Sequence, residues 1–163
     1  MSLKYLYSLS IVFAFMEEII FMRLWHKDLV PFLPREQLLG QWRECCAIAK
    51  SIAKIGTPNH ILVNRIMDYP INHFYNYSLI VVDEFSFRGY RINEDAWSEF
   101  VYYLNSVDPD YFKPCTDEDI FYNWHNDKYL IQCISNLEEK YDCGAISEKE
   151  FNIILEAFDY LIY

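Results

Sequence analysis

The sequence has little of what marks several large classes of protein. Only 4 Gly and 6 Pro occur in 163 residues, which excludes collagen-like and low-complexity chains. It has no Gly-rich phosphate loop, no Gly-x-Ser-x-Gly and no His-Glu-x-x-His, so the motifs of common nucleotide-binding and hydrolytic sites are absent. The apolar run Ile11–Met16 is far too short to cross a bilayer. We therefore expect no membrane contact.

Cysteine and histidine are also sparse and poorly placed for a metal. The chain has no Cys-x-x-Cys pair, and its 4 His do not fall at paired ligand spacings. The number of Cys is odd, and two of the 5 are adjacent, which is typical of reduced thiols in a cytoplasmic protein. The sequence therefore predicts a cytoplasmic protein with no disulfides, no metal and no cofactor. The thiols are Cys45, Cys46, Cys115, Cys133 and Cys143.

Aromatic residues, by contrast, are abundant. Tyr occurs 14 times and Phe 12 times, and 53% of the residues are hydrophobic. A disordered chain is poor in these residues, so we expect a folded domain with a sizeable core.

The charge is divided unevenly along the chain. The net charge is −10, yet residues 22–91 carry nine basic and six acidic side chains, a balance of +3. Residues 92–163 carry four Lys and sixteen acids, a balance of −12. The first part could meet a polyanion and the second would repel one. We therefore expect the acidic part to be dispensable for any contact with a polyanion.

The apolar periodicity predicts an all-α fold. We expect an irregular segment ending at Pro34, a strong helix over 35–54 that stops at Gly56, and a capping box at Ser147 and Glu150. Gly89 is expected to end another helix, and Asn93 to begin the next. The remaining expected helices cover 59–68, 70–88, 94–104, 117–125, 127–141 and 148–160. The expected division is a short N-terminal extension over 1–21, a compact helical domain over 22–104 and an acidic helical extension over 105–163.

The first 21 residues need not be part of the natural protein. The codons of Glu17 and Glu18 can contain GGAG, a ribosome-binding core, and three codons then separate it from the codon of Met22. This spacing suits a bacterial or phage translation start at Met22. Leu9, Val12, Phe13 and Met16 fall at helical spacing, so an N-terminal helix is the alternative.

Arg43 and Glu44 are the charged pair whose positions most favour a role in a functional site. As consecutive residues they project about 100° apart on a helix, so they cannot both be simple partners on one exposed face. Glu44 adjoins the apolar stripe and precedes Cys45-Cys46. Burial without a partner would raise the pKa of this carboxyl. A solvated or ion-paired glutamate is the alternative.

From Met22 to about Ile92 the chain resembles the pyrimidine dimer DNA glycosylases, the endonuclease V-like family. The resemblance lies in MRLWHKDLVPFLPREQLLGQWRECCAIA, NHILVNRIMDYP and FRGYRI. Its strongest element is REQLLGQWRE, in which Arg-Glu follows an aromatic residue after an amphipathic turn. The resemblance covers about 70 of the 163 residues.

The resemblance implies a helical fold whose N-terminus packs on the first long helix. It also implies a reaction mechanism. The α-amine of Met22 would attack the sugar of a damaged nucleotide and form a Schiff base, leading to base release and strand cleavage. Glu44 would stabilise the cationic sugar and move protons. The expected partner is damaged double-stranded DNA. The expected DNA-binding residues are Arg23, His26, Arg43, His60 and Arg65.

A second interpretation remains open at this point. The chain could be a non-enzymatic helical module that kept this fold and uses its acidic C-terminal half to contact a protein partner. Its many aromatic residues would then serve the core and an interface.

Overall fold

A computed structural model describes residues 23–162, and all of them belong to an α-helical fold. No strand occurs among these residues, so the predicted all-α class is confirmed. The expectations for residues 1–21 and for Met22 lie outside the described residues. The helices are η1 (Lys27–Phe32), α2 (Arg35–Ile55), η2 (Asn64–Asp68), α3 (Ile71–Phe87), α4 (Glu94–Val107), α5 (Asp127–Asp142), α6 (Glu148–Ala157) and α7 (Asp159–Ile162).

Several predicted helix ends are confirmed at the atomic level. Gly56 adopts φ 77° directly after α2, a left-handed conformation that favours glycine, and Gly89 ends the turn after α3 in the same way with φ 73°. The Asn93 side chain accepts a hydrogen bond from the amide of Ala96 at 3.0 Å and begins α4. The Ser147–Glu150 capping box is present at the start of α6.

Two predicted helices are wrong. Residues 59–68 form turns followed by the short 3-10 helix η2, because Asn59 adopts φ 59° and the Asn64 side chain accepts a hydrogen bond from the amide of His60. Residues 117–125 form hydrogen-bonded turns. Phe121 adopts φ 52° there, which interrupts a helix while its ring is fully buried.

Smaller corrections concern two other segments. The segment expected to be irregular up to Pro34 contains η1. The last expected helix, over 148–160, ends at Ala157, because Phe158 leaves the helical conformation before α7 begins. The helix expected over 94–104 continues to Val107.

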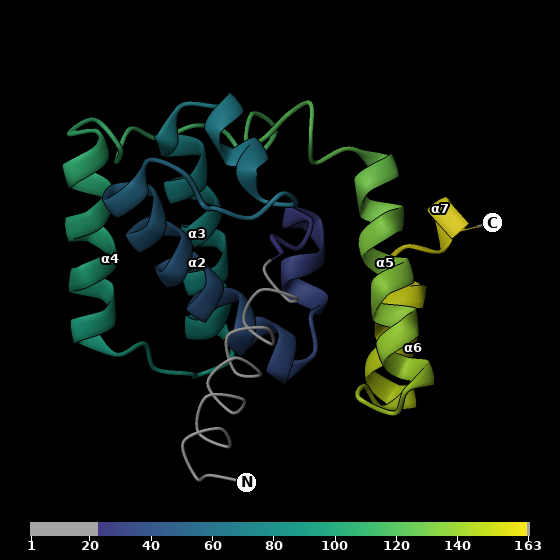
Figure 1. Cartoon of the computed structure of the whole chain (residues 1–163). Coiled ribbons are helices and arrows are strands. Elements are labelled where there is room, and N and C mark those ends of the chain that lie inside the picture. Colours follow the sequence, from purple (N-terminus) through teal and green to yellow (C-terminus); the bar gives the residue numbers. More distant parts are fainter. Residues whose placement is uncertain (1–22, 163) are drawn as a thin grey trace, which may run out of the picture.

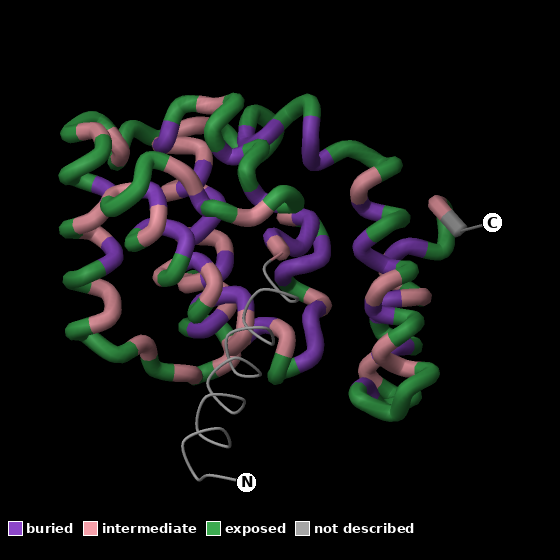
Figure 2. The backbone as a smooth tube through the Cα atoms, viewed as in Figure 1, coloured by how far each residue is buried: buried purple, intermediate pink, exposed green. Residues whose placement is uncertain are grey.

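The helices form two groups joined through η1 (Figure 1). Helices α2, α3 and α4 pack together on one side, whereas α5, α6 and α7 lie on the other. Between them, η1 contacts both α3 and α6. Figure 2 shows the buried residues along the inward sides of both groups.

The buried core runs without interruption across the predicted division near residue 104. Leu24 and Trp25 share one hydrophobic cluster with Tyr77 on α3 and with Trp124 and Leu130 further along the chain. Residues 105–162 therefore supply part of the packing around the first described residues. Within residues 23–162, no helix has the length and apolar character needed to cross a membrane.

Candidate active site

The site is built around the anchored segment, Arg23–Lys27, whose backbone amides are held by side chains. The Arg23 amide donates to Oε2 of Glu44 at 3.1 Å, and the Trp25 amide donates to Oε1 of Gln41 at 2.8 Å. The Lys27 amide donates to Nδ1 of His125 at 3.0 Å. Buried backbone groups need partners, and here side chains take the place of a neighbouring strand or helix turn.

Two tyrosines hold the carbonyl groups of the same segment. The hydroxyl of Tyr77, on α3, donates to the carbonyl oxygen of Trp25 at 2.8 Å. The hydroxyl of Tyr129, on α5, donates to the carbonyl oxygen of Leu24 at 2.5 Å. The anchored segment is therefore fixed from α2, from α3 and from the C-terminal part of the chain.

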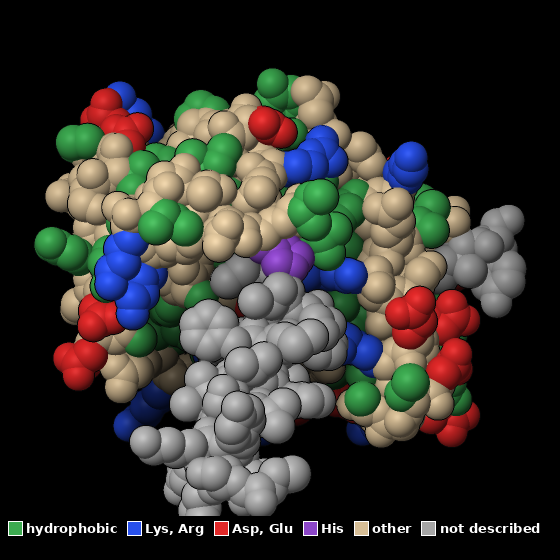
Figure 3. Space-filling view, in the orientation of Figure 1, with side chains coloured by type: hydrophobic (Ala, Val, Ile, Leu, Met, Phe, Trp, Pro, Cys, Tyr) green, Lys and Arg blue, Asp and Glu red, His purple; other side chains and the backbone are tan. Residues whose placement is uncertain are grey.

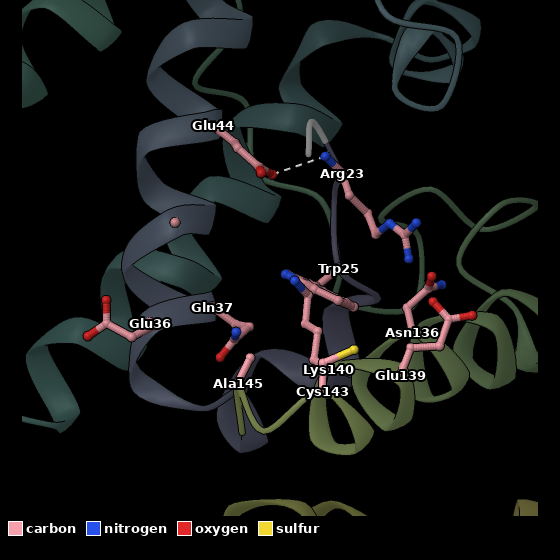
Figure 4. A pocket seen from close by; sticks show the side chains of 11 residues that line it. Arg23, Trp25, Glu36, Gln37, Glu44, Asn136, Glu139, Lys140, Cys143 and Ala145 are labelled. Carbon is pink, nitrogen blue, oxygen red and sulfur yellow. Dashed lines mark hydrogen bonds between the residues drawn. The ribbon is translucent and has the colours of Figure 1, made fainter. Parts of the chain in front are cut away.

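Glu44 stands at the edge of a cavity of about 590 Å³ between the anchored segment, α2 and the C-terminal end of α5 (Figure 4). Its carboxylate is half-buried and contacts the Arg23 amide, as the dashed line in the figure marks. The cavity is lined by Arg23, Trp25, Glu36, Gln37, Gly40, Glu44, Asn136, Glu139, Lys140, Cys143 and Ala145.

The environment of Glu44 changes its acidity strongly. Burial raises the pKa of this carboxyl from 4.5 to about 8, although the Arg23 amide, the Arg23 charge and the charge of Lys140 all favour the ionised form. The predicted effect of burial is thus present, and the partner that partly compensates is a backbone amide. A carboxyl with such a pKa can release and take up a proton near neutral pH.

Arg23 adds a positive charge to the same cavity. Its guanidinium carbon lies 5.5 Å from the centre of the Trp25 ring, which it faces as a cation–π partner. In Figure 4 its side chain runs from the anchored segment toward the α5 wall, where Asn136 and Glu139 lie.

The other predicted DNA-binding residues are not among the cavity lining. Arg43 is exposed on α2. Arg65 is exposed on η2, with its guanidinium carbon 5.5 Å from the Trp124 ring centre. His60 is half-buried in the preceding turn, where its Nδ1 accepts a hydrogen bond from the Leu62 amide. Contact of these residues with DNA stays a prediction.

His26 lies in the core. Its exposed fraction is 2%, and its Nδ1 accepts a hydrogen bond from the Asp28 amide at the start of η1. Its ring stacks on that of His125, with 5.0 Å between the ring centres. Burial lowers the pKa of both imidazoles, and that of His125 strongly. In this structure His26 helps to fix the anchored segment, and a role in DNA contact stays a prediction.

Among the side chains that hold the anchored segment, sequence reasoning found Glu44 but not His125, Tyr77, Tyr129 or Gln41. His125 and Tyr129 are 98 and 105 residues away from the backbone groups they contact. No spacing in the sequence indicates a contact of that kind. Gln41 was not predicted either, although its position three residues before Glu44 places it on the same helix face and is a signal that could have indicated it.

Acidic and basic side chains lie side by side over much of the face shown in Figure 3, but one region is mainly acidic. Acidic side chains gather over α5 and α6, at the lower right of this face. Within residues 23–162, no group of three or more His, Cys, Asp or Glu side chains is placed to hold a metal ion.

Comparison with known proteins identifies one family that part of the chain matches. Residues 22–98 match the model of the family described as pyrimidine dimer DNA glycosylase, which confirms the resemblance over that segment. The matched segment includes the anchored segment and Glu44, but not α5. Neither a curated protein nor a solved structure matches the chain.

Proposed function

We propose that this protein is a DNA glycosylase with AP lyase activity, acting on pyrimidine dimers or related base damage in double-stranded DNA. The family match over residues 22–98 supports a DNA glycosylase type of function and DNA as the partner. The observation that carries the finer proposal is the contact between the Glu44 carboxylate and the amide of Arg23.

The proposed nucleophile is the α-amine of Met22, in a protein whose translation starts at that residue. The Arg23 nitrogen that Glu44 contacts is the atom to which the carbonyl carbon of Met22 is bonded. The carboxylate therefore contacts the peptide bond adjoining the nucleophile. An α-amine has a reference pKa of about 7.7–8.0, so an appreciable fraction is neutral and nucleophilic near pH 7.

The proposed reaction consists of base release, Schiff-base formation and strand cleavage. The amine lone pair forms a bond to the anomeric carbon, C1′, while the bond from C1′ to the base breaks and the base leaves with that electron pair. The amine then loses a proton, and the sugar ring opens as its oxygen takes one up, which gives the Schiff base. Removal of a proton from C2′ finally expels the 3′ phosphate and cleaves the strand.

Glu44 suits the proton steps of this sequence. In its acid form it can protonate the departing base or the ring oxygen, and the carboxylate that results can take the C2′ proton. Its negative charge also stabilises the cationic sugar as the base leaves. A pKa of about 8 lets one group serve in both forms near neutral pH.

Trapping with borohydride tests this proposal directly, because it reduces the Schiff base to a stable covalent adduct. A chain beginning at Met22, incubated with duplex DNA that holds one cyclobutane dimer, should give a trapped adduct. Glu44→Gln should lose the adduct while keeping DNA binding. Glu99→Gln, a matched change at an exposed position on α4, should keep both.

Two comparisons complete the test. The same protein beginning at Met1 carries no free amine at Met22 and should give no adduct. The intact mass of the protein made from its own gene should correspond to a start at Met22. Full adduct formation in Glu44→Gln would remove the catalytic role of Glu44, whereas the absence of an adduct with the unaltered chain beginning at Met22 would favour the non-enzymatic interpretation.

A further inference from the structure

One wall of the cavity comes from outside the segment that matches the family. Asn136, Glu139, Lys140 and Cys143 lie at the C-terminal end of α5 or just after it, and they line the cavity together with Arg23 and Glu44. The matched segment ends at residue 98. Any contribution of this wall to function therefore comes from residues outside the matched segment.

Lys140 is the charged residue of this wall that bears on Glu44. It is half-buried, and in Figure 4 its side chain extends from α5 into the cavity. Its charge favours the ionised form of the Glu44 carboxyl. Among the described residues that line the cavity, Arg23 and Lys140 are the two cations, one on the anchored segment and one on the opposite wall.

The negative charges of the cavity are unevenly placed. Glu36 is exposed and its Oε1 is paired with Arg35 at 2.7 Å, and Glu139 is also exposed. Glu44 has a pKa of about 8, so it is largely uncharged at pH 7. Two cations, Arg23 and Lys140, therefore line the cavity together with the mostly neutral Glu44 and the exposed carboxylates of Glu36 and Glu139, and the two cations can attract an anion.

We propose that Lys140 binds a phosphate of the damaged strand next to the attacked sugar, so that the strand is held between α5 and Arg23. This inference rests on the proposed function, because the anion is identified by the substrate. Each sugar of DNA is bonded to phosphates on both sides, so a sugar placed at Glu44 brings phosphate to the cations around it. A lysine serves such a phosphate as a point charge.

The acidic C-terminal half of the chain would then favour DNA binding at one position, Lys140. Its balance of −12 opposes DNA binding in general, whereas Lys140 offers one local contact where the substrate meets α5. A purely structural alternative exists: Lys140 lies in the last turn of α5, where a cation stabilises the helix dipole. The two roles differ in their dependence on salt.

The test measures binding to a duplex that holds one tetrahydrofuran abasic-site analogue, which cannot form a Schiff base. Affinity is followed by fluorescence anisotropy between roughly 50 and 200 mM KCl. Lys140→Met should weaken binding and make the slope of log K against log salt shallower by about 0.9, the value for one phosphate contact in duplex DNA. Lys140→Arg should restore the slope.

Lys128→Met is the matched control, since Lys128 is exposed on the same helix and does not line the cavity. It changes the net charge equally and should leave the slope unaltered. A Lys140→Met protein that melts at a lower temperature but keeps the full slope would overturn the proposal in favour of the structural role. So would equal slopes in Lys140→Met and Lys128→Met.

The outcome also separates this inference from the proposed function. If the unaltered protein binds the duplex and forms the borohydride adduct, but Lys140→Met keeps the slope, only the role of Lys140 is wrong. If the unaltered protein neither binds the duplex nor forms an adduct, both proposals fall together.

Discussion

Gln41 and Glu44 lie three residues apart on α2 and hold alternate amides of the anchored segment, those of Trp25 and Arg23. Residues at this spacing share one face of a helix, and alternate amides of an extended chain point in the same direction. The helical spacing of Gln41 and Glu44 thus matches the spacing of alternate amides in the segment, so one face of α2 holds the amides of both Arg23 and Trp25. The nitrogen of Gln41 also lies 3.5 Å from Oε2 of Glu44, which links the two side chains.

Replacing Glu44 by Gln should stabilise the protein in a pH-dependent way. The pKa of Glu44 is about 8 in the folded protein and near 4.5 when unfolded, so the folded state holds a proton that the unfolded state releases between these values. This group therefore lowers the free energy of unfolding as pH rises from 4.5 to 8. Glu44→Gln should equal the unaltered protein near pH 4 and exceed it by up to roughly 5 kcal/mol at pH 9.

Chemical denaturation of the full chain at several pH values measures this difference. Glu99→Gln, at an exposed position, should follow the pH dependence of the unaltered protein. A difference between Glu44→Gln and the unaltered protein that does not grow with pH would show that Glu44 is not held in a desolvated position.

Tyr77→Phe should destabilise the protein through a single lost hydrogen bond. The Tyr77 side chain is fully buried, and its hydroxyl is 2.8 Å from the Trp25 carbonyl oxygen. Removing the hydroxyl leaves a buried carbonyl without this donor, at a cost of about 1–3 kcal/mol. Tyr102→Phe, whose side chain is 69% exposed, should change the free energy of unfolding by less than about 0.5 kcal/mol. Equal effects in urea denaturation would contradict the anchoring role.

Arg43→Ala should weaken DNA binding without abolishing adduct formation. Arg43 is exposed on α2, one residue before Glu44, and does not line the cavity. If it contacts one phosphate, its removal makes the salt slope shallower by about 0.9. Lys149→Ala, at an exposed position on α6, is the control. Identical slopes in both variants would show that Arg43 contacts no phosphate.

The buried pair His26 and His125 should make the fold sensitive to acid. Burial lowers the pKa of both imidazoles, and the neighbouring charges of Lys27 and Arg65 lower that of His125 further. A base with a depressed folded pKa takes up its proton more readily when unfolded. The two imidazoles therefore do not reduce the free energy of unfolding above the unfolded pKa of about 6.5. That free energy falls as the pH drops below this value.

Thermal melting between pH 7 and pH 5 checks this expectation. His125→Gln keeps an acceptor for the Lys27 amide but cannot take up a proton, so its melting temperature should fall less on acidification. His60→Gln, in the turn before η2, should keep the full loss. If both variants lose stability in parallel with the unaltered protein, other groups cause the acid sensitivity.

A chain that ends at Leu104 should fail to fold, contrary to the expectation that the acidic part is dispensable. Truncation removes Trp124, which is 2% exposed, and the side chains of His125 and Tyr129 that hold the anchored segment. The remaining chain would expose the core around Leu24. Circular dichroism and heat denaturation of the truncated chain measure this. A cooperative transition like that of the full chain would show that residues 22–104 fold independently.

The local structure of this protein follows from short stretches of its sequence. The stripe over 35–54, the glycines at 56 and 89, Asn93 and the Ser147–Glu150 box each act within one or two helix turns, and each behaves as predicted. The segment 117–125 does not, because the burial of Phe121 against distant residues favours a left-handed conformation over a helix. Local propensity is weak enough for tertiary packing to override it.

The sequence by itself determined the helical class, the main helix boundaries and the position of Glu44 beside an apolar stripe. It also carried the family resemblance that the match over residues 22–98 confirms. Only the tertiary structure decided that His125 and Tyr129 return to hold residues 24–27, and that α5 supplies the second wall of the cavity. Periodicity and capping report interactions over a few residues, whereas these contacts depend on how all the helices fill one core. The site is therefore jointly made by the matched segment and by the chain that follows it.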